Sequence, residues 1–466
     1  MATISSIGVG SGLDVNSIIT QLVAVEKVPL NKLKTEATSL QTKLTTYGKV
    51  QSYLSALREA SSALTRTDTW GQTIGTSSDP TAAAVTTSAT TKTGNYTLEV
   101  QRLAAYQSNA TATYASADTV IGSGSLSIEL GTWGAGQTTF TPKPGATAVT
   151  LTVNPPGATL AGLRDQINAA GAGVTASVLT DASGARLVVR SSTTGAANAF
   201  RIGTTGGLSA LAFDPSVGIR TMPQSVAAAD AAATLNGLTV TSASNTLSNV
   251  LDGMTLTLNK VTTAPVQITV TQDNPSMRKA MDTFVSAYND LNKLLADQTK
   301  YDAASKVAGG LQGDSAAVAI RAQMRAIVGA TSGASTLFTR LSDIGFDLKL
   351  DGSLTLNDTK VNNALANLPE TKKLFSNSDL LLPGNNGIAT QMRVLADRLI
   401  GSDGTVSTRT EGLRKRIGLN QTRQDQLSER IAMVETRLRA QYTALDRTMG
   451  KLSGLSSYVA QQFGTK

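Results

Sequence analysis

The sequence predicts a multidomain α+β protein: a terminal coiled-coil or helical stalk formed by both chain ends, with two inserted β-rich (α+β) head domains. Two observations lead to this prediction. Apolar residues recur with heptad spacing near both ends of the chain. Residues 71–274 between them change to short Val-, Thr- and Leu-rich runs separated by Gly, Ser, Asn and Pro. With 466 residues, the chain has room for several domains of ordinary size.

The order helix, β, β, helix predicts nested domains, with the β heads inserted into a stalk made from opposite ends of the chain. The predicted divisions are terminal leg helices at 1–40 plus 438–466, a helical stalk domain with a small hairpin at 41–70 plus 275–437, a β-rich head at 71–105 plus 224–274, and an outer α+β head at 106–223.

The N-terminal part begins with a Gly-rich run at 8–12 and Asp14, which we expect to cap a helix. The glycines lack the spacing and the context of a phosphate-binding loop. Pro29 is expected to interrupt this helix, because proline removes a backbone donor and disfavours helix before it. The helix then resumes with a heptad seam formed by Leu30, Leu33, Ala37, Leu40, Leu44, Tyr47, Gln51 and Leu54.

The middle of the chain carries strand and turn signals. Asn236-Gly237 between two apolar runs predicts a tight hairpin. Residues 149–190 predict a strand–helix–strand–strand module in which Thr159 caps the helix. The Gly-, Ser- and Pro-punctuated residues 203–222 predict a connector.

The C-terminal half returns to helix after Asn274-Pro275. A third seam is formed by Met277, Met281, Phe284, Tyr288, Leu291 and Leu295. Asp314 is expected to open another helix, and a hairpin is expected to turn at Asp351-Gly352-Ser353.

The longest heptad pattern covers residues 408–463. One set of positions is Ile417, Gln424, Ile431, Leu438, Leu445, Leu452 and Val459, and the interleaved set is Leu413, Asn420, Leu427, Val434, Gln441, Thr448 and Leu455. This spacing is typical of a coiled-coil seam. Beyond Leu438 the seam contains Gln441 and Thr448, and this polarity favours contact with another copy or another protein over burial within the monomer. We expect this downstream part, and residues 15–28 from the other end of the chain, to have no partner within the monomer.

Composition argues against several classes of function. The chain contains no Cys and no His, which removes Cys–His and Ser–His nucleophiles, thiolate and imidazole metal sites, and disulfides. We therefore expect no enzyme, no cofactor and no metal, and we interpret Asp343 and Asp347 as strand-edge and turn residues. Acidic residues alternate with the basic ones of the C-terminal stretch, which favours a solvated helix flank over nucleic-acid binding. We also expect no membrane insertion and no ordinary cleaved signal.

Several strings, in order along nearly the whole chain, resemble the bacterial flagellar filament cap protein family (FliD, also called hook-associated protein 2). They are Gly10-Ser11-Gly12-Leu13-Asp14-Val15, Gly94-Asn95-Tyr96-Thr97-Leu98, Gly253-Met254-Thr255-Leu256-Thr257-Leu258, and Leu311-Gln312-Gly313-Asp314-Ser315. Residues 160–191 also resemble a small module shared by flagellins and hook proteins.

The resemblance implies a protein secreted through the flagellar export apparatus to the extracellular tip of the flagellum. Several copies would form a homo-oligomeric ring on the filament, promote folding and insertion of flagellin subunits, and bind an export chaperone through the C-terminal helix. The oligomer and filament contacts would then come from Leu13, Ile18, Leu22, Val25, Leu438, Leu445, Leu452, Leu455 and Val459. The stalk seam would comprise Leu33, Leu40, Leu44, Leu54, Met281, Phe284, Tyr288, Leu291, Ile417, Leu427 and Ile431.

Two alternatives remain open from the sequence. Gly- and Ser-rich β heads on a stalk also suit a surface adhesin that binds host glycan or mucin through its outer domain. Terminal heptad helices also occur in other flagellar axial subunits, although the Gly-Ser-Gly-Leu-Asp opening favours the cap.

Overall fold

The computed structural model describes residues 14–155, 158–304 and 306–464. The chain forms two compact units: a helical unit of residues 1–70 with 275–466, and a β unit of residues 71–274. Leu13, one of the predicted contact residues, lies outside the described residues.

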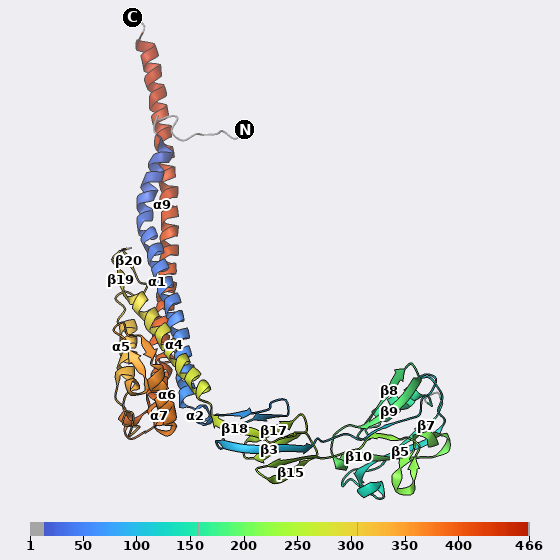
Figure 1. Ribbon diagram of the computed structural model, residues 1–466. Helices are drawn as coiled ribbons and strands as arrows, with labels where there is room; N and C mark the ends of the chain where they lie inside the picture. Colours follow the sequence, from blue (N-terminus) through green and yellow to red (C-terminus); the bar gives the residue numbers. More distant parts are fainter. Residues whose placement is uncertain (1–13, 156–157, 305, 465–466) are drawn as a thin grey trace. The chain divides into compact units, whose positions relative to one another are not determined.

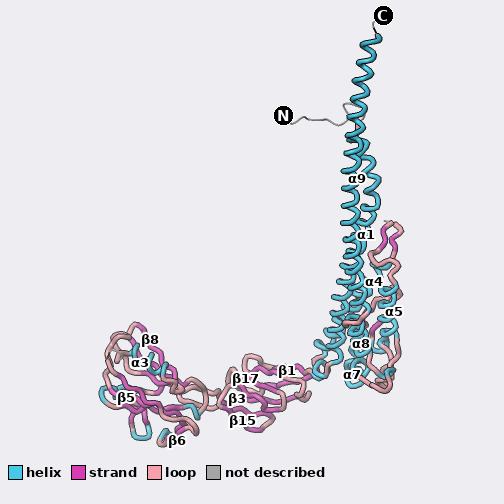
Figure 2. The backbone as a smooth tube through the Cα atoms, turned by 180° about the vertical axis from the view of Figure 1, so that it is seen from behind, coloured by secondary structure: helices cyan, strands magenta, loops and turns pink. Residues whose placement is uncertain are grey.

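The helical unit is built from two very long helices and several short elements (Figures 1 and 2). Its elements are α1 (Val15–Thr65), α2 (Thr67–Gly71), α4 (Asn274–Thr299), α5 (Ser315–Gly329), α6 (Asp358–Ala366), α7 (Leu368–Ser376), α8 (Ile388–Ile400) and α9 (Thr405–Phe463), with the hairpins β19–β20 (Tyr301–Asp302, Val307–Ala308) and β21–β22 (Phe346–Leu348, Leu354–Leu356). The predicted caps are present: Asp14 accepts a hydrogen bond from the Ser17 amide at 3.0 Å, and Asp314 accepts one from the Ala316 amide at 3.0 Å.

Helix α1 runs without interruption through Pro29, so the expected break there is wrong. The side chain of Pro29 is exposed, while Val23 and Leu30 on either side of it are buried. Packing of the flanking turns against α9 therefore holds the helical path across the one missing backbone donor.

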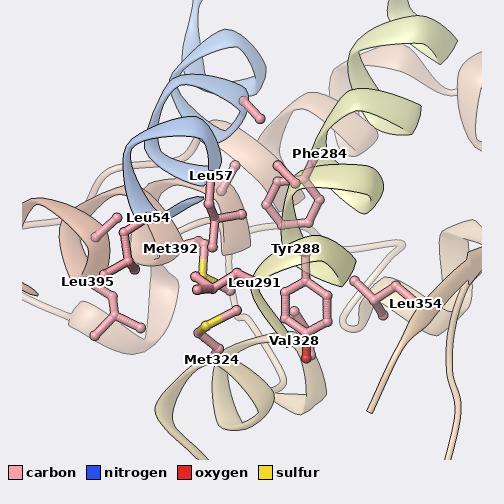
Figure 3. Packing of buried hydrophobic residues seen from close by; sticks show 14 of the residues in the cluster. Leu54, Leu57, Phe284, Tyr288, Leu291, Met324, Val328, Leu354, Met392 and Leu395 are labelled. Carbon is pink, nitrogen blue, oxygen red and sulfur yellow. The ribbon is translucent and has the colours of Figure 1, made fainter. Parts of the chain in front are cut away.

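The main core of the helical unit lies where α1 meets α4, α5 and α8 (Figure 3). The predicted third seam on α4 lies in this core, and its residues Met281, Phe284, Tyr288 and Leu291 are fully buried. On α1, Val50 is buried and Gln51 is exposed, so the predicted seam is wrong by one position there. The reason is that this part of α1 packs on several helices, whereas a heptad seam describes contact with one partner.

The β unit contains two cores. In the first, a five-stranded sheet in the order β1-β18-β3-β14-β15 packs on a three-stranded sheet in the order β16-β17-β2. The strands are β1 (Thr73–Ser77), β2 (Ala83–Thr86), β3 (Gly94–Arg102), β14 (Ala231–Leu235), β15 (Leu238–Ser242), β16 (Thr246–Leu251), β17 (Met254–Leu258) and β18 (Val266–Gln272). The predicted hairpin turns at Asn236 and Gly237, whose φ angles of 49° and 81° match a two-residue hairpin loop.

The second core lies between a six-stranded and a four-stranded sheet, with α3 (Leu160–Ala169) packed against it. The first sheet contains β5 (Gly124–Trp133), β6 (Phe140–Pro142), β7 (Val149–Val153), β10 (Ala199–Thr204), β11 (Phe213–Asp214) and β12 (Ile219–Arg220), and the second contains β4 (Ser108–Ala110), β8 (Val174–Asp181), β9 (Gly184–Ser191) and β13 (Gln224–Val226). Thr159 caps α3 as predicted, accepting from the Gly162 amide at 3.1 Å.

Residues 203–222 are part of this second core, so the predicted connector is wrong. They contain β11 and β12 and bury Leu208, Leu211 and Phe213. Their glycines and prolines mark turns between short elements that extend the sheet at β10. The predicted strand–helix–strand–strand module also spans two sheets, because β7 pairs with β5 while β8 pairs with β9.

Candidate functional site

The heptad pattern of α9 is visible as a stripe of reduced exposure that faces α1. Leu413, Asn420 and Ile431 are buried, and the seam positions between them are half-buried. Helices α1 and α9 lie side by side along this stripe in both views (Figures 1 and 2). The chain therefore supplies an internal partner for the first part of the C-terminal seam.

A polar layer fixes the register of this helix pair. Glu36 of α1 lies opposite α9, where its Oε2 accepts a hydrogen bond from Asn420 Nδ2 at 3.4 Å and its Oε1 lies 3.5 Å from Arg416. The Asn420 Oδ1 in turn accepts from Gln424 Nε2 at 2.6 Å. A buried Asn in a helical seam stabilises one register over others, because a shifted register leaves its amide without partners.

The beginning of α1 forms a small apolar cluster with α9. The buried members are Val15, Ile19, Val23, Leu30 and Ile431, and Leu427, Leu438 and Tyr442 pack against them. The expectation that residues 15–28 have no partner within the monomer is therefore wrong. The reason is that Val15, Ile19 and Val23 form the apolar face of this part of α1. This face packs against the part of the α9 seam that ends at Tyr442.

Beyond Tyr442 the seam continues but is uncovered. The apolar side chains in this part of α9 are between 42% and 61% exposed: Leu445, Met449, Leu452, Leu455, Tyr458 and Val459. Helix α9 continues for 21 residues past Tyr442, about 30 Å at 1.5 Å per residue. We call these six side chains the exposed seam.

The predicted contact residues occupy two environments. Leu445, Leu452, Leu455 and Val459 belong to the exposed seam, and Leu22 and Val25 of α1 are 41% and 70% exposed. Ile18 and Leu438 are half-buried, and Leu438 packs within the α1–α9 cluster. The heptad pattern does not identify Met449 and Tyr458, because each lies one position away from the two heptad sets.

The predicted stalk residues are also divided. Leu40, Leu54, Met281, Phe284, Tyr288 and Leu291 are buried in the main core, with Leu44 and Ile417 packed against it. Leu427 and Ile431 belong instead to the α1–α9 cluster, and Leu33 is half-buried.

No helix in the part of the chain that the structure describes is long and apolar enough to cross a membrane. Within the same described residues, no group of three or more Asp or Glu side chains is placed to hold a metal ion. Asp343, one of the two acids considered from the sequence, accepts hydrogen bonds from the Thr339 and Arg340 amides, each at 2.9 Å, as a turn residue does.

Comparison with known proteins assigns most of the chain to one family. Residues 11–107 match the N-terminus and residues 228–454 the C-terminus of flagellar hook-associated protein 2. Residues 143–193 match the flagellin hook IN motif, as the sequence of this region suggested.

Full-length relatives show the same assignment. The chain is 33% identical over 479 residues to flagellar hook-associated protein 2 of Escherichia coli K12, covering 99% of this chain and 98% of that protein. It is 30% identical over 485 residues to the A-type flagellar hook-associated protein 2 of Pseudomonas aeruginosa, covering 97% and 96%.

A solved structure agrees with the fold. The crystal structure of the D1-D2-D3 domains of the flagellar cap protein FliD from Escherichia coli aligns with a TM-score of 0.64 at 30% identity, covering 79% of this chain and 99% of that one. These descriptions all concern the flagellum, and none favours the adhesin alternative. The chain belongs to the flagellar hook-associated protein 2 family, the cap proteins of the flagellar filament.

Proposed function

We propose that this protein caps the growing flagellar filament as a homo-oligomeric ring, and that the exposed seam of α9 is the surface through which each copy contacts the filament tip. In this proposal the protein is secreted by the flagellar export apparatus and acts outside the cell. It promotes folding and insertion of flagellin subunits by contact alone, without covalent chemistry.

The observation that carries the proposal is the exposed seam. A helix of this length that keeps its heptad spacing after its internal partner has ended presents an apolar stripe to water. Such a stripe is typical of a surface that becomes covered on assembly. Family membership supports the flagellar filament as this assembly.

The partner at this surface is a helical seam of the filament end or of a neighbouring copy. Leu445, Leu452 and Val459 keep the spacing of seven residues that one helix needs to pack along another. We further propose that the export chaperone binds the same segment before secretion, because a chaperone that covers it would keep the apolar stripe from aggregating.

The test is to express a double variant, Leu445→Asp with Leu452→Asp, in a strain that lacks the native gene. Both side chains are about half exposed, at 45% and 55%, so the monomer should remain folded. Assembly should fail, because two carboxylates would have to be buried in an apolar seam. We expect loss of motility and secretion of unassembled flagellin into the medium.

The matched control places the same charges on the same segment of α9 but outside the exposed seam. Ser453→Asp with Ser457→Asp changes two exposed side chains that lie between the seam positions. It should retain motility. Normal filaments in the leucine double variant would contradict the proposal, and failure of both variants would show that charge on the segment, rather than burial of the seam, causes the defect. Since the chaperone is proposed to bind the same segment, the amount of the variant protein in the medium is measured to separate failed export from failed capping.

A further inference from the structure

A pocket of about 410 Å³ lies in the helical unit, between the middle of α1, the start of α5 and the N-terminal part of α9. Its polar lining is Lys43 and Tyr47 from α1, Asp314 at the start of α5, and Arg409 and Arg416 from α9. It is remote in sequence from the exposed seam, and neither the cap role nor the comparisons assign it a function.

The pocket has an excess of positive charge. Lys43, Arg409 and Arg416 contribute three cations against the one carboxylate of Asp314. Lys43 has no ion-pair or hydrogen-bond partner among the described residues. Arg409 reaches Asp314 only at 3.7 Å, and Arg416 reaches Glu36, beside the pocket, at 3.5 Å.

The Asp314 carboxylate is already committed to its own helix. Its Oδ1 accepts from the Ala316 and Ala317 amides at 3.0 and 3.4 Å and is the same oxygen that faces Arg409. One carboxylate oxygen shared in this way does not satisfy the guanidinium donors of Arg409, which supplies five N–H groups.

A buried hydroxyl also faces this pocket without a partner. Tyr47 is 1% exposed, and no described group lies at hydrogen-bonding geometry to its hydroxyl oxygen, although Asp314 and Arg409 lie close enough to shift its pKa. Burial, and then the nearby Asp314 carboxylate, raise the pKa of the Tyr47 hydroxyl well above its ordinary value, whereas Arg409 lowers it. The phenol is therefore a neutral donor at physiological pH. A buried donor without an acceptor is costly.

Taken together, these groups offer more hydrogen-bond donors than the single carboxylate that lines the pocket can satisfy. Lys43, Arg409, Arg416 and the Tyr47 hydroxyl converge on one cavity from two helices. A ligand that satisfies them must carry negative charge and several acceptor oxygens pointing in different directions, which describes a small oxyanion. A cation is disfavoured by the net charge, and an apolar group would leave the donors unsatisfied.

We infer that this pocket is a binding site for a small oxyanion of the phosphate or sulfate type. Lys43 and the two arginines hold the anion by charge-assisted hydrogen bonds, and Tyr47 donates to it from the buried side. Because the ligands come from α1 and α9, and Asp314 caps α5, an anion bound there would tie together the three helices at this level of the stalk.

The test is isothermal titration of the full-length protein with inorganic phosphate and, separately, with sulfate, at ionic strength held constant with NaCl. We expect saturable binding of about one anion per chain. Arg409→Gln should weaken binding by about tenfold or more, the loss of one charge-assisted hydrogen bond. Lys415→Gln, which removes the same charge from an exposed position of the same helix, should bind as the unaltered protein does.

Tyr47→Phe keeps the ring in the core and removes only the hydroxyl, so it tests the site in a protein that folds. It should bind phosphate several-fold more weakly. In anion-free buffer its melting temperature should equal or exceed that of the unaltered protein, because an unsatisfied buried hydroxyl has been removed. Sulfate raises the melting temperatures of proteins in general. The site is therefore supported only if sulfate raises the melting temperature of Lys415→Gln more than that of Tyr47→Phe.

Absence of saturable binding to the unaltered protein would overturn the inference. Equal affinity in the unaltered protein, Arg409→Gln and Tyr47→Phe would overturn it as well, since the anion would then bind elsewhere. Both results leave the capping proposal untouched, because that proposal depends on the exposed seam.

Discussion

Ile431→Ala is the perturbation that most directly examines the pairing of the two chain ends. Ile431 is 5% exposed and is the one fully buried α9 residue in the cluster with Val15, Ile19, Val23 and Leu30. This cluster is separate from the main core of the helical unit. Opening of residues 15–30 from α9 is therefore expected to be a local event that leaves the main core folded.

The magnitude follows from the packing. Truncating a buried Ile to Ala costs about 2–5 kcal/mol in a closed core. A contact between two helices with no third layer belongs at the lower end, about 2 kcal/mol. When exchange is governed by the opening equilibrium, that change accelerates amide exchange about 30-fold.

The assay is hydrogen–deuterium exchange of the monomer, read by mass spectrometry on peptides from residues 15–30 and from α4. We expect about 30-fold faster exchange in the first and no change in the second. Leu452→Ala is the matched control, since Leu452 is 55% exposed on the same helix and its truncation should change exchange in neither peptide. Unchanged protection of residues 15–30 in Ile431→Ala would show that Ile431 does not hold the beginning of α1 on α9.

Three further predictions concern other parts of the chain. Amides of residues 443–463 should exchange rapidly in the monomer and become protected on assembly, because a single uncovered helix of this length is marginal in water; strong protection at low protein concentration would argue against the exposed seam. Hydrogen bonds to the Glu370 carboxylate, first from Lys373 and then from Ser335 and Thr336, lower its pKa from the ordinary 4.5 to about 2. The stability that the ionised Glu370 contributes is therefore present above pH 4.5 and is lost as the pH falls towards 2. The difference in melting temperature between the unaltered protein and Glu370→Gln should therefore shrink over that range, and a difference that stays constant with pH would contradict this assignment. Gly237→Ala should destabilise the β unit by about 1–2 kcal/mol in denaturant unfolding, because the Gly237 φ of 81° is strained for any side chain, even though no atom lies within 4 Å of the added Cβ. Gly48→Ala, on the exposed face of α1, should instead stabilise the helical unit by about 0.5–1 kcal/mol. Equal effects of the two substitutions would show that the loop conformation at Gly237 does not matter.

The local features of the fold could be predicted from the sequence because each depends on residues close together in the chain. The caps at Asp14, Thr159 and Asp314 bond amides two or three residues away. The Asn236-Gly237 turn needs only the backbone freedom of its own two residues. The heptad spacing of α9 likewise predicts a helix with one apolar face, whatever that face contacts.

What covers that face was decided by the tertiary structure alone. The same spacing continues on both sides of Tyr442, yet the first part packs on α1 and the second is exposed, because helix α1 begins at Val15, after its cap Asp14. Tolerance of Pro29 depends in the same way on contacts of its neighbours Val23 and Leu30 with another helix. The order of residues 203–222 likewise depends on the sheet edge at β10, which no local pattern shows.

The candidate sites divide along the same line. Periodicity identified Leu445, Leu452, Leu455 and Val459 as seam positions, and burial then separated them from Ile431 on the same helix. The oxyanion pocket could not be predicted, because Tyr47 and Arg409 are more than 300 residues apart and neither lies in a recognisable motif. Sequence spacing determines which side of an element is apolar or charged, but contact between distant elements determines which of those groups are left without a partner.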